Sequence, residues 1–125
     1  MEKYMTYNLN LNDRAFAAIK AKTKRVEIRV TRDACKKDYS KFKEGDIIIF
    51  KNSLGQQIEC LVECNNWYKT AEELLTLEGT RYTLSSTNDF DEGIKSINSF
   101  EGYTEGIKRN GIHAIHIKYV RELEE

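Results

Sequence analysis

The sequence predicts an α+β fold, a mixed β-barrel of about five to six strands with helices packed around it. Segments that alternate like half-buried strands occur near both ends of the chain, and segments with helical spacing occur between them. The chain contains no proline, repeat or Gly/Ser-rich linker that would mark a boundary. We therefore expect one domain over residues 1–125, closed by pairing between early and late strands.

The first part of the chain predicts a strand, a helix and a second strand. Residues 4–11 alternate roughly, and Asn12 or Asp13 can cap a helix that extends to about Lys22. Residues 24–30 alternate clearly, with an apolar face at positions 26, 28 and 30. The opposite face of this strand is charged and consists of Arg25, Glu27 and Arg29. Because this face is charged, we expect a functional site to include its side chains.

The remaining elements follow from turn and capping signals. Residues 47–50 and 58–64 read as two strands joined by a hairpin turn that contains Gly55. Thr70 and Glu73 form a capping box for a helix through about residue 77. We expect a second helix from Asn88 or Asp89, a third that ends at Asn110-Gly111, and a last strand over residues 112–120.

Composition indicates a globular cytoplasmic protein, which we take as a monomer. Hydrophobic residues make up 40% and charged residues 32% of the chain, which is atypical of disordered proteins. The longest apolar run, residues 47–50, is far shorter than the roughly 20 residues that span a membrane, and the N-terminus has no apolar signal region. The three cysteines, Cys35, Cys60 and Cys64, lack the spacing of a disulfide framework, so we expect a reducing compartment.

Charge is unevenly distributed although the formal net charge is zero. Residues 14–43 contain eleven basic and three acidic side chains, whereas residues 59–105 contain ten acidic and three basic ones. A basic block can supply contacts to nucleic-acid phosphates. Alternatively, folding interleaves the two blocks and their charges pair on the surface. A third interpretation makes the acidic block, around Glu101, a docking surface for another protein.

A family resemblance rests on an ordered set of motifs. In chain order these are Lys24-x-x-Glu27-x-Arg29 after the first helix, Gly45-Asp46 before an apolar strand, Trp67-Tyr68 before the Glu72–Leu75 segment, Tyr103, and the strand that begins Gly111-Ile112-His113. This order resembles the ASCH domain, a family of the PUA-like superfamily, over nearly the whole chain. The family signature is Gly-x-Lys-x-x-Glu-x-Arg, and Lys22 occupies the place of its glycine.

The resemblance implies a PUA-like barrel with a cleft that binds RNA or a small nucleotide-derived ligand, with no cofactor and no metal. Lys24, Glu27 and Arg29 would line the cleft. The full set of expected binding residues is Lys20, Lys22, Lys24, Arg25, Glu27, Arg29, Arg32, Trp67 and Tyr103. The basic members would contact phosphates, and Trp67 or Tyr103 would lie at the rim, where aromatic rings can stack on bases.

A related branch, the bacterial N4-acetylcytidine amidohydrolases, implies an alternative function. That branch uses Lys-x-x-Thr-x-Arg, in which the lysine activates a nucleophilic threonine, together with a distant glutamate. Lys24 and Arg29 match its lysine and arginine, but Glu27 occupies the threonine position. The nearest candidates for the distant glutamate are Glu92 and Glu101.

Three interpretations of Lys24, Glu27 and Arg29 remain open on the residues alone. Glu27 and Arg29 can form an ordinary ion pair on one strand face. All three can bind a ligand. If the protein is an enzyme, Glu27 can act as a general base on water while Lys24 or Arg29 stabilises the oxyanion.

The histidines and cysteines do not predict a metal site. His113 and His116 lie three residues apart on a predicted strand, so their side chains would point to opposite faces. Cys60 and Cys64 would be about 13 Å apart at roughly 3.3 Å per residue, too far to share a zinc ion.

Overall fold

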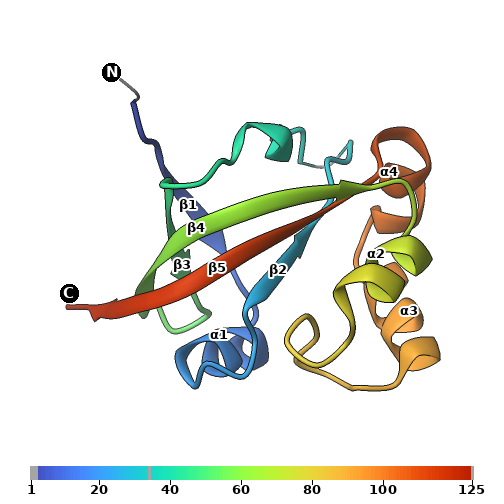
Figure 1. Cartoon of the computed structure of the whole chain (residues 1–125). Coiled ribbons are helices and arrows are strands. Elements are labelled where there is room, and N and C mark those ends of the chain that lie inside the picture. Colours follow the sequence, from blue (N-terminus) through green and yellow to red (C-terminus); the bar gives the residue numbers. More distant parts are fainter. Residues whose placement is uncertain (1–2, 34, 125) are drawn as a thin grey trace.

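A computed structural model describes residues 3–33 and 35–124, and over these residues five strands form one mixed sheet with four α-helices and one 3-10 helix around it (Figure 1). The elements are β1 (Thr6–Asn10), α1 (Asp13–Lys20), β2 (Val26–Arg29), η1 (Tyr39–Lys41), β3 (Ile47–Lys51), β4 (Gln57–Tyr68), α2 (Ala71–Glu78), α3 (Phe90–Ser99), α4 (Tyr103–Asn110) and β5 (Ile112–Leu123). The predicted α+β, PUA-like barrel is confirmed and takes the form of a half-barrel. The single domain, the monomeric state and the cytoplasmic location stay predictions.

The sheet is open between its first two strands. Its strand order is β1-β3-β4-β5-β2, so that, of the described strands, β1 and β2 occupy the two edges. β1 pairs parallel with β3, and the other ladders are antiparallel, including the expected pairing of early β2 with late β5. Instead of a ladder, the guanidinium of Arg29 on β2 bridges to β1, with Nη2 donating to the Asn10 carbonyl at 2.7 Å. We call this junction between β1 and β2 the seam.

Two hydrophobic clusters cover opposite faces of the sheet. Ile115 and Ile117 of β5 join the inner cluster with residues of β1, β3, β4 and α1. Ile112 and Ala114 join the outer cluster, which packs against α2, α3 and α4. These three helices gather at one end of the sheet, whereas α1 lies near the seam (Figure 1). The period-two alternation of β5 therefore distributes its side chains between both clusters.

Helix starts lie where the capping signals predicted them. Asn12 Oδ1 accepts from the Ala15 amide at 2.8 Å, and Thr70 Oγ1 accepts from the Glu73 amide at 3.1 Å. Asp89 caps α3 in the same way, through the Glu92 amide. Each of these contacts lies within four residues, which is why local sequence predicts them.

The first helix ends earlier than expected, at Lys20. The Thr23 amide donates to Ala18 O at 2.9 Å, and the Lys22 amide donates to Ile19 O at 3.0 Å, which is the bonding pattern of a Schellman motif. Lys22 has a φ of 66°, in the left-handed region that favours glycine. The place at which the family signature has glycine is therefore the left-handed end of α1.

The two long strands extend further than the sequence predicted. β4 reaches Tyr68, beyond the expected end at Cys64, because residues as far as Tyr68 pair with β5. Asparagine has low strand propensity, so Asn65 and Asn66 concealed this extension in the sequence. β5 reaches Leu123, which pairs with Gln57. Among the described residues, none of the helices has the length and apolar character needed to cross a membrane.

Candidate functional site at the barrel seam

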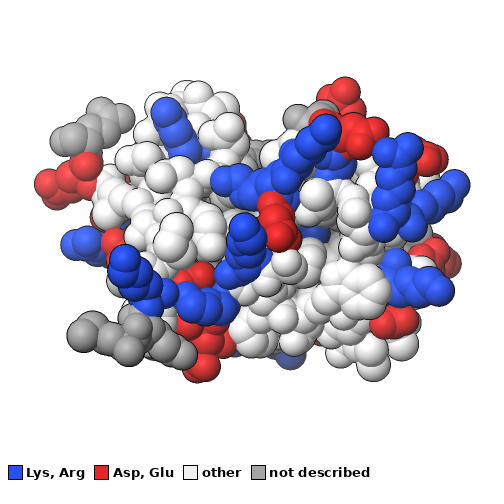
Figure 2. Space-filling view, turned by 90° about the horizontal axis from the view of Figure 1, so that it is seen from above, with Lys and Arg blue, Asp and Glu red and all other residues white. Residues whose placement is uncertain are grey.

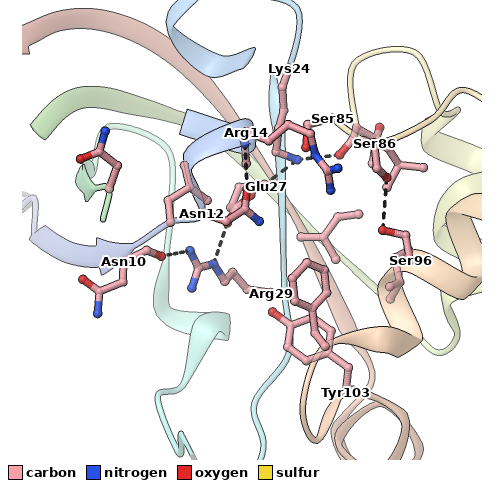
Figure 3. Close-up of a pocket in the computed structure, with 18 of the residues that line it drawn as sticks. Asn10, Asn12, Arg14, Lys24, Glu27, Arg29, Ser85, Ser86, Ser96 and Tyr103 are labelled. Atoms are coloured by element: carbon pink, nitrogen blue, oxygen red, sulfur yellow. Dashed lines mark hydrogen bonds and ion pairs between the residues drawn. The ribbon is translucent and has the colours of Figure 1, made fainter. Parts of the chain in front are cut away.

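A cavity of about 590 Å³ opens at the seam, where side chains rather than a strand ladder separate β1 from β2 (Figure 3). Its walls come from the end of β1, the start of α1, β2, the turn after β3, residues 83–86, the end of α3 and the start of α4. Small-molecule sites typically measure about 300–1,000 Å³. The cavity is therefore large enough for one nucleoside-sized ligand.

Glu27 and Arg29 of β2 line this cavity, whereas Arg25 of the same predicted charged face does not. Glu27 lines it, with only 5% of its surface exposed. Arg29 Nε donates to Glu27 Oε2 at 2.8 Å, and Lys24 Nζ lies 3.5 Å from Glu27 Oε1. Two cations thus hold one buried carboxylate in the cavity wall (Figure 3). Burying these charges is tolerable because they compensate one another.

Lys24 directs its ammonium group at protein atoms. Its Nζ donates to Val26 O and to Thr83 O, each at 2.6 Å, and pairs with Glu27. An ammonium has three N–H donors, so these contacts occupy all of them. Burial lowers the pKa of Lys24, while the neighbouring Glu27 carboxylate acts in the opposite direction. In this arrangement Lys24 positions Glu27 and the segment around Thr83.

Arg29 keeps donors for a ligand. Its Nε binds Glu27, its Nη2 binds the Asn10 carbonyl, and the Tyr39 side chain is a third partner, whereas a guanidinium has five N–H donors in a fixed plane. Burial acts against the charged form, but Glu27 together with Tyr103 and Tyr39 outweighs burial and raises the pKa of Arg29. Arg29 is therefore a permanent cation that can meet an anionic or carbonyl group in the cavity.

Two aromatic rings contribute to the wall near α4. Tyr103 is 7% exposed, and burial raises its pKa to about 12, with Arg29 opposing and Glu27 adding to the rise. Phe100 is 45% exposed, and its ring centroid lies 5.2 Å from that of Tyr103. Phe100, which our sequence analysis did not select, is therefore the more accessible ring for a ligand to stack on.

Cations also line the rim of the cavity. Exposed Arg14 of α1 points into it (Figure 3), and exposed Lys51 lies at the end of β3. Arg32, which the sequence predicted, donates from Nη1 to the Glu101 carbonyl at 2.9 Å. No local pattern distinguishes Arg14 or Lys51 in the sequence, because only the fold brings α1 and the β3–β4 turn to the seam.

The structure brings some of the predicted residues together and separates others. Those that line the seam cavity are Lys24, Glu27, Arg29, Arg32 and Tyr103. Lys22 and Arg25 line a second, smaller cavity, and Lys20 forms an ion pair with Glu122. Trp67 lies in neither cavity, and its Nε1 donates to the Asn110 carbonyl at 2.9 Å.

Of the two candidates for a distant glutamate, Glu101 lines the seam cavity. Glu92 is exposed on α3, where it pairs with Lys95. Only Glu101 is thus placed to act in the same cavity as Glu27.

Hydroxyl and amide groups make up much of the remaining wall. Those that the sequence analysis did not select are Asn10, Asn12, Asn52, Ser53, Thr83, Ser85, Ser86 and Ser96. Ser86 and Ser96 are hydrogen-bonded to each other at 3.2 Å. Among the described residues, the buried hydroxyl of Thr83 has no hydrogen-bond partner. In the sequence, the run of polar residues from Ser85 to Asn88 could have indicated a polar wall of a binding site.

The two histidines contact different residues. His113 Nδ1 lies 3.1 Å from Asn65 Oδ1, and His116 Nε2 lies 2.7 Å from Glu78 Oε1. No group of three or more potential metal-ligating side chains occurs in the part of the chain that the structure describes. Among the cysteines that the sequence analysis compared, Cys60 is buried and Cys64 is exposed.

Basic and acidic side chains lie beside one another on part of the molecular surface. Figure 2 shows basic and acidic side chains interspersed over one face of the molecule. Arg29 and Lys24 pair with Glu27 inside the basic block, and Arg109 pairs with Asp33 across the chain.

The chain has structural neighbours whose names state no function. It is similar to hypothetical protein PH0355, with 28% identity, a TM-score of 0.78, and coverage of 93% of this chain and 100% of that chain. It is also similar to protein PF0455 from Pyrococcus furiosus, with 25% identity, a TM-score of 0.70, and coverage of 94% and 99%. Both neighbours are Pyrococcus proteins. No protein-family model matches the chain, and no curated protein matches it significantly. The structural likeness extends over nearly the whole chain.

Proposed function

We propose that this chain is an ASCH-type domain that binds RNA or a nucleotide derivative in the seam cavity. The observation that carries the proposal is the Glu27–Arg29 pair, buried in the wall of a nucleoside-sized cavity with donors of Arg29 left over. A carboxylate can accept hydrogen bonds from an amino group of a base, and a guanidinium can donate to ring or phosphate oxygens.

The rim fits the same ligand class. Arg14, Arg32 and Lys51 are cations at the cavity mouth, where they can meet phosphate groups. The exposed ring of Phe100 offers a stacking surface for a base. Within this proposal, Glu27 and Arg29 contact the base, Lys24 positions Glu27, and the rim cations contact the backbone or phosphate.

Binding to single-stranded RNA tests the proposal by fluorescence anisotropy at low and high salt. We expect Arg29→Ala to weaken binding by about tenfold or more, since hydrogen bonds to charged groups contribute roughly 1.5–3 kcal/mol. Exposed Arg14→Ala should weaken binding severalfold without affecting the fold. The matched control is Lys69→Ala, an exposed lysine outside both cavities. Equal affinity of wild type and both arginine variants would overturn the proposal.

Lys24→Ala is a poor test of ligand contact. The substitution leaves Glu27 and two backbone carbonyls without their buried partner, so it should unfold part of the site. Circular dichroism and thermal unfolding must accompany any Lys24 or Arg29 variant, because Arg29 is also a buried partner of Glu27.

The second candidate function is a small amidohydrolase acting on N4-acetylcytidine or a related acylated nucleoside. The observation that favours it is a carboxylate, Glu27, beside the donors of Arg29 in a cavity wall. Glu27 would take a proton from water as the water oxygen attacks the acetyl carbonyl, and Arg29 would stabilise the oxyanion. The C–N bond then breaks, and the proton passes to the leaving amine to release cytidine and acetate.

Incubation with N4-acetylcytidine, followed by chromatography for cytidine, tests this candidate. Wild-type protein should release cytidine, and Glu27→Gln should abolish the release because an amide cannot accept the proton. Absence of turnover at high protein concentration, in a preparation that binds RNA, would exclude the hydrolase and leave the binding function.

A further inference from the structure

A second cavity of about 310 Å³ lies next to the seam cavity and carries a cationic rim. Four basic side chains line it, Lys22, Lys24, Arg25 and Lys118, with a single carboxylate, Glu63. Among the described residues, no ion pair or hydrogen bond of the Lys22 or Lys118 side chain is found, and both residues are exposed. These ammonium groups are therefore available to an external anion.

The floor of the second cavity is apolar. Ile19 and Ile117 are almost fully buried, at 1% and 2% exposed, so half-buried Tyr119 is the more accessible apolar side chain there. An inorganic anion has no apolar surface to bury against this floor. The sugar or base of a nucleotide can pack on it while the phosphate of the same nucleotide contacts the basic rim. The cavity thus has the two kinds of surface that one nucleotide presents.

The two cavities share a wall. Lys24 lines both of them, and on α1 Ala15 lines the seam cavity while Ile19 lines the second. Four helical residues correspond to about 6 Å along the helix axis. Arg25 lies 4.3 Å above the ring of Tyr82, which is followed in the chain by Thr83 of the seam cavity. Arg25 and Tyr82 therefore connect residues of the two cavities.

We propose that the second cavity binds the neighbouring nucleotide of a single RNA strand whose base occupies the seam cavity, with Lys22 and Lys118 on its phosphate. This inference rests on the proposed function and narrows its ligand from a free nucleotide derivative to an oligonucleotide. The Arg25 guanidinium, stacked on Tyr82, adds a further positive charge, and half-buried Tyr119 packs against the sugar or base.

Two probes of different length separate the cavities: cytidine monophosphate and a single-stranded cytidine pentamer, each titrated calorimetrically at two salt concentrations. Cytosine is chosen because its amino group can donate to a carboxylate such as Glu27. Lys118→Ala should weaken pentamer binding about threefold to tenfold and reduce the salt slope by about 0.7, the value for one phosphate contact on a single strand. Its affinity for cytidine monophosphate should not change.

Lys22→Asn provides a second, independent variant. Asparagine tolerates the left-handed conformation at this position and removes the charge, so the turn after α1 is kept. It should reproduce the selective loss of pentamer affinity. Lys108→Ala, an exposed lysine on α4 outside both cavities, should leave both affinities unchanged.

Arg29→Ala distinguishes failure of this inference from failure of the proposed function. Loss of both probes in Arg29→Ala, with unchanged pentamer binding in Lys118→Ala and Lys22→Asn, would overturn the second nucleotide site alone. Equal losses for both probes in the lysine variants would also overturn it, since the lysines would then act on the seam ligand. Unchanged binding of both probes in Arg29→Ala would overturn the proposed function and this inference with it.

Discussion

Arg29 Nε donates to Glu27 Oε2 at 2.8 Å, between side chains two residues apart on β2. A surface pair of this kind contributes little to stability, and this interpretation was one of those that the sequence left open. Here the side chains are only 14% and 7% exposed, and Lys24 approaches the same carboxylate. The pair is therefore both the electrostatic centre of the seam and part of a cavity wall.

Glu27→Gln should lower the free energy of unfolding by about 3 kcal/mol, because it leaves two buried cations without their anion. Urea denaturation at neutral pH measures the change. The control is Glu92→Gln, which removes an exposed pair with Lys95 and should cost less than about 1 kcal/mol. Similar losses in the two variants would mean that the buried pair contributes no more than a surface pair.

Lys22→Gly should raise the free energy of unfolding by about 0.5–1 kcal/mol, because Lys22 has a φ of 66°, where a side chain is strained. Thermal or urea unfolding tests this. Ala17→Gly, in the exposed middle of α1, should instead lower stability by about 1 kcal/mol. A loss of stability in Lys22→Gly would show that the strain at the end of α1 is negligible.

Thr83→Val should raise the free energy of unfolding by about 1 kcal/mol, since it replaces a buried hydroxyl that has no hydrogen-bond partner among the described residues. Thr31→Val should have the opposite effect, because the Thr31 hydroxyl donates to the Lys37 carbonyl at 2.7 Å. Differential scanning calorimetry distinguishes the two. Destabilisation by Thr83→Val would indicate that a bound water satisfies this hydroxyl.

Glu78 should contribute to the free energy of unfolding at neutral pH, and this contribution should be lost at acidic pH. Burial opposes ionisation of this carboxyl, but hydrogen bonds from Tyr68 and Asn66 and the contact with His116 outweigh burial and lower its pKa. A lowered folded-state pKa stabilises the protein fully above the unfolded pKa near 4.5, and the contribution disappears as the pH falls through the folded value.

The stability difference between wild type and Glu78→Gln should thus be constant near neutral pH and shrink between about pH 5 and about pH 3. Thermal unfolding across this range measures it. Glu105→Gln, at an exposed position on α4, should give a small difference at every pH. A difference for Glu78 that is independent of pH would contradict the lowered pKa.

Local signals predicted much of the fold correctly. The caps at Asn12, Thr70 and Asp89 and the alternation of β2 all arise within a few residues, so the sequence contains them completely. The pairing of β2 with β5 followed from strands at both ends of the chain. The lengths of β4 and β5 could not be predicted, because the length of each strand depends on its partner strand rather than on its own residues.

The seam site was only partly predictable. The motif placed Glu27 and Arg29 on one strand face, but no local pattern could state that this face turns inward. Arg14 and Phe100 come from other elements and reach the cavity only because β1 and β2 lie at opposite edges of an open sheet.

The basic segment from Lys20 to Arg32 shows which properties the sequence determines and which depend on tertiary structure. Its composition and the Lys24-x-x-Glu27-x-Arg29 spacing are properties of the sequence, and so is the strand alternation they follow. Tertiary structure decided that all N–H donors of the Lys24 ammonium bind protein atoms, whereas the Arg29 guanidinium keeps N–H donors for a ligand. It also decided that Lys22 and Arg25 line the second cavity. The physical reason is burial. Which charges are desolvated, and against which partners, depends on contacts between residues far apart in the chain.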